Sequence, residues 1–164
     1  MKKIIVTAIP VLMLFLGFSQ EKLYDVSKIP EELKKNAYSV IREEQLTFDI
    51  KSIDKATYKV HKAVTILNEN GRSELIFHEF TDQFRSLESA SIQLFDSKGN
   101  SVQKYKRSDL LKQTAGDGLV PDGKVYYIEV PAASYPVTIL VDYEIKFTGC
   151  SITRLMQFNY PSNR

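Results

Sequence analysis

The chain has 164 residues, which suits one folded domain with a substantial core and is short for two. Its formal net charge is +2, and Lys2 and Lys3 lie in an N-terminal stretch that we predict to be removed, so the remaining chain has no net charge. This balance argues against nucleic acid as a partner. Cys150 is the only cysteine, which excludes a disulfide within the chain.

Residues 1–19 have the pattern of a secretory signal peptide. An apolar run from Ile4 to Phe15 follows the two lysines, and Gly17-Phe18-Ser19 places small residues at the −3 and −1 positions of a cleavage site. The run contains Pro10 and is shorter than the roughly 20 residues that a membrane-spanning helix needs. We therefore predict export to the periplasm or extracellular space, cleavage before Gln20 and no stable membrane span afterwards.

The remaining residues, 20–164, are predicted to form a single domain, and truncation at its C-terminal end stays open as an alternative. Its first element is a short helix, Pro30–Asn36. Proline suits the first helical turn, and the acidic residues before the lysines match the helix dipole. A helix of two turns is marginal alone, so we expect it to dock on a sheet.

From Tyr38 onward the apolar residues recur at every second position, which is typical of strands. The segments 38–50 and Thr57–Leu67 are predicted strands, with Leu46, Phe48 and Ile50 on one side of the first. Lys62 breaks the pattern of the second and is interpreted as a lysine at a strand edge or one that reaches solvent. Asn68-Glu69-Asn70-Gly71 predicts a tight hairpin turn, because Asn-Gly accepts positive φ angles.

Further strands follow in the second half of the chain. Asp96–Asn100 predicts a turn with Gly99 in the left-handed region, between two paired strands. Ser108–Leu111 is predicted as one helical turn, Thr114–Gly123 as a loop, and Ser151–Phe158 as a candidate for an additional strand. The other predicted strands are Glu74–Phe80, a strand with Ala90, Ile92 and Leu94 facing inward, Ser101–Tyr105 and Lys124–Val130.

Val137–Phe147 is the clearest strand of all. Its apolar or aromatic residues occupy every second position, and only Leu140 breaks the alternation. Such a strand buries one face and needs neighbours on both sides. The pattern of the whole chain predicts an all-β fold, an antiparallel β-sandwich of seven to eight strands with one short N-terminal helix.

Candidate catalytic groups are few. Cys150 with His61 or His78 is the only thiol–imidazole combination, and no helix signal follows Cys150 to lower the pKa of its thiol. The two histidines also lack ligand-like spacing to each other or to a carboxylate cluster, so we expect ordinary strand histidines rather than a metal site. We therefore predict no catalytic residue, no metal, no cofactor and no enzymatic activity.

Three other features carry weaker suggestions of binding. Asp117 and Asp122 lie in a glycine-rich loop without the spacing of a calcium-binding loop. Lys104, Lys106 and Arg107 beside Tyr105 form a basic cluster that we interpret as a solvated strand end. Nine tyrosines and nine phenylalanines could supply a platform for glycan, but most fall at inward strand positions and the chain has no tryptophan.

Four segments together resemble one protein family. They are Asp25–Leu33, Ala63–Gly71, Asp96–Asn100 and Tyr143–Phe147. The family is an uncharacterised β-sandwich domain at the N-terminus of exported bacterial proteins, where it precedes a transglutaminase-like, papain-related domain. The resemblance covers about residues 24–149 and implies a non-catalytic accessory module whose partner is a transglutaminase-like domain absent from this chain.

In such proteins the catalytic Cys, His and Asp lie in the downstream domain, so the resemblance gives Cys150 no role. Relatives also continue with more β-structure beyond the region that corresponds to Arg164. Two other functions stay open. One is a free-standing module for binding or adhesion to envelope glycan or protein, and the other, less favoured, is a hydrolase that uses Cys150.

Overall fold

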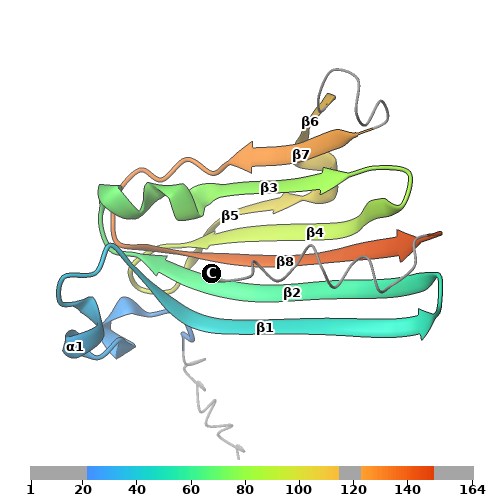
Figure 1. Ribbon diagram of the computed structural model, residues 1–164. Coiled ribbons are helices and arrows are strands. Elements are labelled where there is room, and N and C mark those ends of the chain that lie inside the picture. Colours follow the sequence, from blue (N-terminus) through green and yellow to red (C-terminus); the bar gives the residue numbers. More distant parts are fainter. Residues whose placement is uncertain (1–21, 115–122, 150–164) are drawn as a thin grey trace, which may run out of the picture.

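The computed structural model describes residues 22–114 and 123–149 (Figure 1). Several predictions concern residues outside these ranges: the signal peptide of residues 1–19, the loop aspartates Asp117 and Asp122, Cys150, and the candidate strand Ser151–Phe158. Within the described ranges, no helix is long and apolar enough to cross a membrane.

The described residues form eight strands in two antiparallel sheets, which confirms the predicted fold class. The larger sheet has the order β1-β2-β8-β4-β5 and the smaller one β3-β7-β6. The larger sheet comprises β1 (Ser39–Ser52), β2 (Lys55–Ile66), β8 (Val137–Thr148), β4 (Arg85–Phe95) and β5 (Ser101–Lys106). The smaller comprises β3 (Ile76–Thr81), β7 (Lys124–Glu129) and β6 (Leu111–Thr114). The helical turns are η1 (Val26–Lys28), α1 (Glu31–Lys34), η2 (Glu69–Leu75) and η3 (Arg107–Asp109).

The predicted long strand is the centre of the larger sheet. β8 pairs with β2 along its whole length and with β4 on its other side, so both of its edges are satisfied. Ile139, Ile145 and Phe147 are buried on the inner face, which lies toward the smaller sheet, whereas Leu140 is only partly buried. Its alternation therefore predicted both the strand and the side that packs.

The N-terminal segment covers part of the outer face of the larger sheet. Arg42 of β1 donates to the carbonyl oxygens of Leu23 and Asp25 at 3.3 and 3.5 Å, and the ring of Tyr24 contacts that of Phe95. The predicted helix is present as the single turn α1, and Asn36 follows it with a φ of 62°. The segment is thus docked on the sheet, as its short helix requires.

The predicted hairpin at Asn68–Gly71 is wrong. The Asn68 side chain accepts a hydrogen bond from the backbone N–H of Asn70 at 3.1 Å and begins the 3-10 helix η2 instead of a tight turn. β2 pairs with β1 and β8, and η2 carries the chain across to the smaller sheet. Gly71 is needed for space rather than for a positive φ, because a Cβ there would lie 2.6 Å from the carbonyl oxygen of Tyr38.

The turn between β4 and β5 is as predicted. Gly99 has a φ of +74°, and the Asp96 carboxylate accepts hydrogen bonds from the backbone N–H groups of Lys98 and Asn100 at 2.9 and 2.8 Å. The strands that this turn joins are paired. The helical turn predicted at Ser108–Leu111 is present in part, as η3, which ends at Asp109; Leu111 instead begins β6, a strand that was not predicted.

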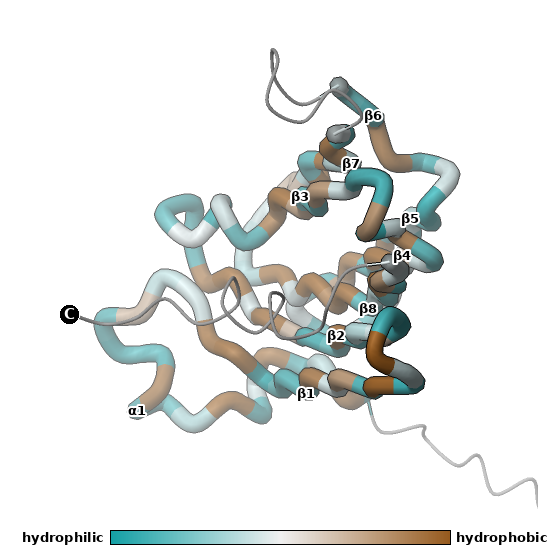
Figure 2. Tube along the Cα trace, turned by 45° about the vertical axis from the view of Figure 1, so that its right-hand side comes forward, coloured by the Kyte–Doolittle hydropathy of each residue, from teal (hydrophilic) through white to brown (hydrophobic). Residues whose placement is uncertain are grey.

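The smaller sheet covers only part of the larger one. In Figure 2 the chain connects β5 directly to β6 on one side, whereas β1 and β3, the other edge strands of the two sheets, lie apart. Leu46 and Ile50 face inward from β1 but remain 57% and 49% exposed. Lys62 lies on β2, which is flanked by strands on both sides, so the strand-edge interpretation is wrong and the solvent-reaching one is correct.

Candidate functional site

A groove of about 480 Å³ lies at the open side of the sandwich, between the inner face of β1 and β2 and the edge strand β3. We call it the inner groove. It is far larger than a single water site and is within the range of small ligand pockets. Its lining residues are Glu44, Leu46, Tyr58, Val60, Lys62, Val64, Ser73, Glu74, Ile76, Phe77, His78, Ile139, Val141 and Tyr143.

The floor of the inner groove is apolar and aromatic. The ring of Tyr143 meets those of Phe77 and Tyr58 edge-on, with centroids 5.4 and 6.4 Å apart. Burial, and then the neighbouring carboxylate of Glu79, raise the pKa of the Tyr143 phenol, so this ring is a neutral hydrogen-bonding group. Ile76, at the rim, is 46% exposed. The groove therefore offers apolar contacts to whatever occupies it.

Charged residues lie around this apolar floor. Lys62 Nζ is 3.4 Å from the Glu74 carboxylate, and Glu44 also lines the groove. Next to Tyr143, the Glu79 carboxylate accepts a hydrogen bond from Arg85 Nη2 at 2.5 Å. The Arg85 guanidinium also lies 5.6 Å from the centre of the Phe147 ring. The groove therefore combines apolar area with charge of both signs.

Strand β3 gives the inner groove one open backbone edge. It pairs with β7 alone among the described strands, and the Val130 N–H donates to the Leu75 carbonyl at 3.0 Å. Because hydrogen-bonding direction alternates along a strand, the register then directs the N–H and C=O groups of Ile76, His78 and Phe80 away from β7. An extended segment could pair with this edge by β-strand addition.

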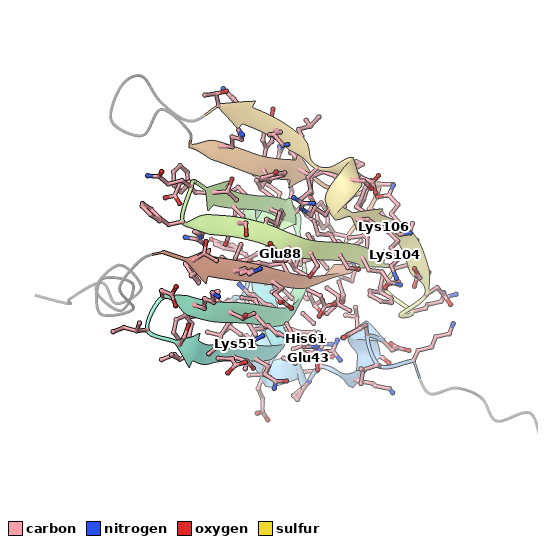
Figure 3. All side chains as sticks on the ribbon, turned by 90° about the vertical axis from the view of Figure 1, so that its right-hand side faces the viewer. Glu43, Lys51, His61, Glu88, Lys104 and Lys106 are labelled. Atoms are coloured by element: carbon pink, nitrogen blue, oxygen red, sulfur yellow. The ribbon has the colours of Figure 1, made fainter. Side chains whose placement is uncertain are left out.

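A second feature, on the outer face, is a polar cluster of Tyr24, Glu43, His61 and Asp142, which we call the outer cluster. His61 Nδ1 is 2.6 Å from the Asp142 carboxylate and Nε2 is 3.4 Å from that of Glu43. The Tyr24 hydroxyl donates to Glu43 from the N-terminal segment. Figure 3 shows His61 and Glu43 side by side on the two neighbouring strands. The cluster links three strands to the docked N-terminal segment.

Sequence spacing missed this cluster. His61 and Asp142 are 81 residues apart but are direct partners in the register of β2 and β8. Along the chain His61 has no carboxylates at ligand-like spacing, as predicted, but in the folded structure the carboxylates of Asp142 and Glu43 lie next to its ring. Among the residues that the structure describes, no group of three or more His, Cys, Asp or Glu side chains is arranged to hold a metal ion.

We expect the outer cluster to make stability depend on pH through His61. The hydrogen bond to Asp142, and then the Asp142 and Glu43 charges, raise the pKa of His61 above its ordinary 6.5. Its contribution to the free energy of unfolding is therefore complete below the unfolded-state pKa and is lost as pH rises through the folded-state pKa. The loss in the His61→Gln variant should be larger at about pH 5 than at about pH 9.

Urea denaturation of wild type and variant at the two pH values measures this difference. His78→Gln is the control, since His78 is an exposed strand histidine outside the outer cluster. A His61→Gln effect that is equal at both pH values would contradict the assignment.

The remaining predicted candidates do not come together. His61 lies on the outer face and His78 on the rim of the inner groove, so the larger sheet separates them. Lys104 and Lys106 are exposed on the edge strand β5, as Figure 3 shows, and Arg107 begins η3. Arg107 lies 5.6 Å from the centre of the Tyr126 ring. The basic cluster is thus a solvated strand end, as its interpretation from sequence stated.

Comparisons with known proteins agree with this architecture. A family described as a domain of unknown function with a solved structure, DUF3857, matches residues 54–161. A crystal structure described as a "putative protease" from Parabacteroides distasonis has a TM-score of 0.60 at 12% identity, over 69% of this chain and 24% of that chain. This likeness concerns the fold alone, and our chain spans about a quarter of that protein's length. No curated protein gives a significant match.

Proposed function

The chain belongs to the DUF3857 family, and from this premise we propose that it is a non-catalytic accessory module of a longer exported protein. In that protein, a transglutaminase-like domain would carry out the chemistry, and this module would position or bind the substrate. The signal-peptide pattern of residues 1–19 supports export. The fold that it shares with a quarter of a much longer protein supports its role as one part of a larger chain.

The single observation that carries the proposal is the open inner groove. Sandwich folds bury the inner faces of both sheets, yet Leu46 and Ile50, on the inner face of β1, are each about half exposed. Exposed apolar side chains that adjoin a groove favour contact with further polypeptide. These side chains would become buried if a later part of a longer chain, or a neighbouring domain, packed against the inner groove.

The surroundings of His61 support a non-catalytic role. A histidine that activates a nucleophile needs one ring nitrogen within hydrogen-bond reach of a hydroxyl or thiol. Both ring nitrogens of His61 face carboxylates, those of Asp142 and Glu43. This arrangement fixes the imidazole between two strands and favours a structural role.

The intact mass of the native exported protein, captured with an antibody against residues 22–114, tests the proposal. We expect a mass well above the 18.8 kDa of this chain. A mass slightly below 18.8 kDa, as signal cleavage alone would produce, would contradict membership of a longer protein. A Cys150→Ser variant provides the catalytic test, and loss of a measurable hydrolytic activity in it would contradict the non-catalytic role.

A second candidate function is peptide or glycan binding by a free-standing module. The observation that favours it is the pairing of an apolar groove with the open edge of β3. Titration with strand-forming apolar peptides and with envelope glycan fragments would measure it. Binding that is lost in Leu46→Asp and kept in the distant control Ile53→Asp would support this function, and the absence of binding to either probe would argue against it.

A further inference from the structure

We propose that a second, cationic pocket binds a phosphate group, either as inorganic phosphate or as a phosphomonoester. We call it the anion pocket, and Arg85, Arg107, Lys124 and Tyr126 are among its lining residues. Its volume of about 220 Å³ is below that of a site for a drug-sized ligand and suits a small charged group. It shares no lining residue with the inner groove, so this inference goes beyond the proposed function and does not depend on it.

The anion pocket lies where strands of both sheets meet at one end of the sandwich. Figure 1 shows that β3 ends, and β4 and β7 begin, at this end. Thr81 lines the pocket from β3, Arg85 from β4 and Lys124 from β7, and η3 adds Arg107. Of the basic cluster predicted beside Tyr105, only Arg107 lines the pocket. The fold therefore gathers charges that are far apart in the sequence.

The ring of Tyr126 brings two cations together. Lys112 of β6 is the cross-strand partner of Tyr126, and its Nζ lies 5.0 Å from the centre of the ring. The guanidinium carbon of Arg107 lies 5.6 Å from the same centre. Burial raises the pKa of the Tyr126 phenol, but the hydrogen bonds and charges of Lys112 and Arg107 outweigh burial and hold this pKa below its ordinary 10. Both cations therefore lie close to a phenol that is a strong hydrogen-bond donor.

Most of these cations lack a carboxylate partner. Arg107, Lys112 and Lys124 are exposed, and none of them forms an ion pair with a carboxylate in the part of the chain that the structure describes. Arg85 is the exception, since its Nη2 donates to the Glu79 carboxylate at 2.5 Å. Like charges that gather without a counter-charge repel one another, so an anion that binds among them is attracted by all three.

One carboxylate, that of Asp82, also lines the anion pocket. Its Oδ1 accepts hydrogen bonds from the backbone N–H groups of Phe84 and Arg85, each at 2.8 Å, so it holds the turn between β3 and β4. The lining residues thus carry three cationic groups and one carboxylate, and their balance is positive. A phosphate dianion has two negative charges and several acceptor oxygens, which matches this balance better than a carboxylate ligand with a single charge.

Titration of the full chain, followed by NMR, tests the proposal. The probes are inorganic phosphate and a sugar phosphate, added at constant ionic strength because salt alone would screen the cations. We expect saturable shifts of the Arg107, Lys124 and Tyr126 signals, with dissociation constants in the millimolar range or tighter. Binding should also raise the pKa of the Tyr126 phenol, measured from its ring-carbon signals, because a nearby anion disfavours the phenolate.

Variants that change one charge locate the binding. Arg107→Gln and Lys124→Gln each remove a cation, and we expect each to weaken phosphate binding at least about tenfold. Lys104→Gln is the matched control, because Lys104 is an exposed lysine of β5 that does not line the anion pocket. Asp82→Asn removes the opposing charge and keeps an Oδ1 acceptor for the turn, so it should tighten binding. All four side chains are partly or fully exposed, so we expect each variant to keep a native amide spectrum.

Three results would overturn the proposal. The first is the absence of saturable binding of either probe. The second is binding that Arg107→Gln and Lys124→Gln leave unchanged, or that Lys104→Gln weakens as much as they do. The third is acetate that binds as tightly as phosphate, which would make a carboxylate the ligand group. Equal affinity for the two probes would support recognition of the phosphate group alone, and tighter binding of the sugar phosphate would support a phosphomonoester as the ligand. All of these results leave the proposed function to be decided by the native mass.

Discussion

Replacing Ile145 with alanine is expected to lower the free energy of unfolding by about 2–5 kcal/mol. Ile145 is fully buried in the C-terminal half of β8, with Tyr58 of β2 and Leu87 of β4 as its partners on either side. The substitution removes apolar area from the core and leaves a cavity between strands that hold one another in place, so little collapse can relieve it.

Urea denaturation followed by tyrosine fluorescence measures the effect, since the chain has nine tyrosines and no tryptophan. The matched control is Ile53→Ala, which makes the same chemical change at a turn residue that is 82% exposed. We expect the control to change stability by less than about 0.5 kcal/mol. Similar losses in both variants would contradict the assignment of β8 as the centre of the core.

The second large effect is expected at the ion pair below the inner groove. Arg85→Met should lower the free energy of unfolding by about 3 kcal/mol, because it leaves the Glu79 carboxylate without its cation. The Glu79 side chain is only 11% exposed and that of Arg85 is 28% exposed, so water cannot fully replace the lost partner. The buried Arg85 Nε already has no hydrogen-bond partner in the described structure, which makes the pair costly to maintain.

A double variant separates the interaction energy of Arg85 and Glu79 from the cost of leaving the Glu79 charge without its cation. Arg85→Met combined with Glu79→Leu removes both charges and fills the space with apolar atoms, so we expect it to recover most of the stability that Arg85→Met loses. The coupling energy from the four proteins measures the interaction of the two residues. A double variant that is less stable than either single variant would show that the ion pair itself stabilises the fold strongly.

The two edge strands on the open side of the sandwich, β1 and β3, are protected differently. β1 carries several charged residues and has register shifts against β2 near each end, between Ile41 and Glu43 and between Ile50 and Ser52. Irregularities and charges of this kind discourage the addition of another strand. β3 is short and regular and contains Ile76, Phe77 and Phe80. The open edge of β3 is therefore the better acceptor of an additional strand.

Much of the fold followed from local patterns in the sequence. The alternation in 137–147 depends only on neighbouring residues, and it predicted a central strand with Ile139 and Ile145 inside. The Gly99 turn was predictable for the same reason, because its φ angle and its Asp96 contacts involve residues close in the chain. Asn68–Gly71 failed because the Asn68 side chain has two local uses, turning a hairpin or capping a helix, and the path to the smaller sheet selected the second.

The candidate sites depended on contacts that no local pattern contains. His61 meets Asp142 only because β2 and β8 pair in one register, and Glu43 joins them from β1. Period-two alternation assigned Leu46 to the inner face but could not tell how far the smaller sheet would extend over it. The sequence by itself therefore determined the longer strands, their faces and the Gly99 turn with its local hydrogen bonds, but not the short strand β6. The tertiary structure alone decided which strands pair, which inward faces are covered, and hence where the inner groove and the open edge of β3 lie.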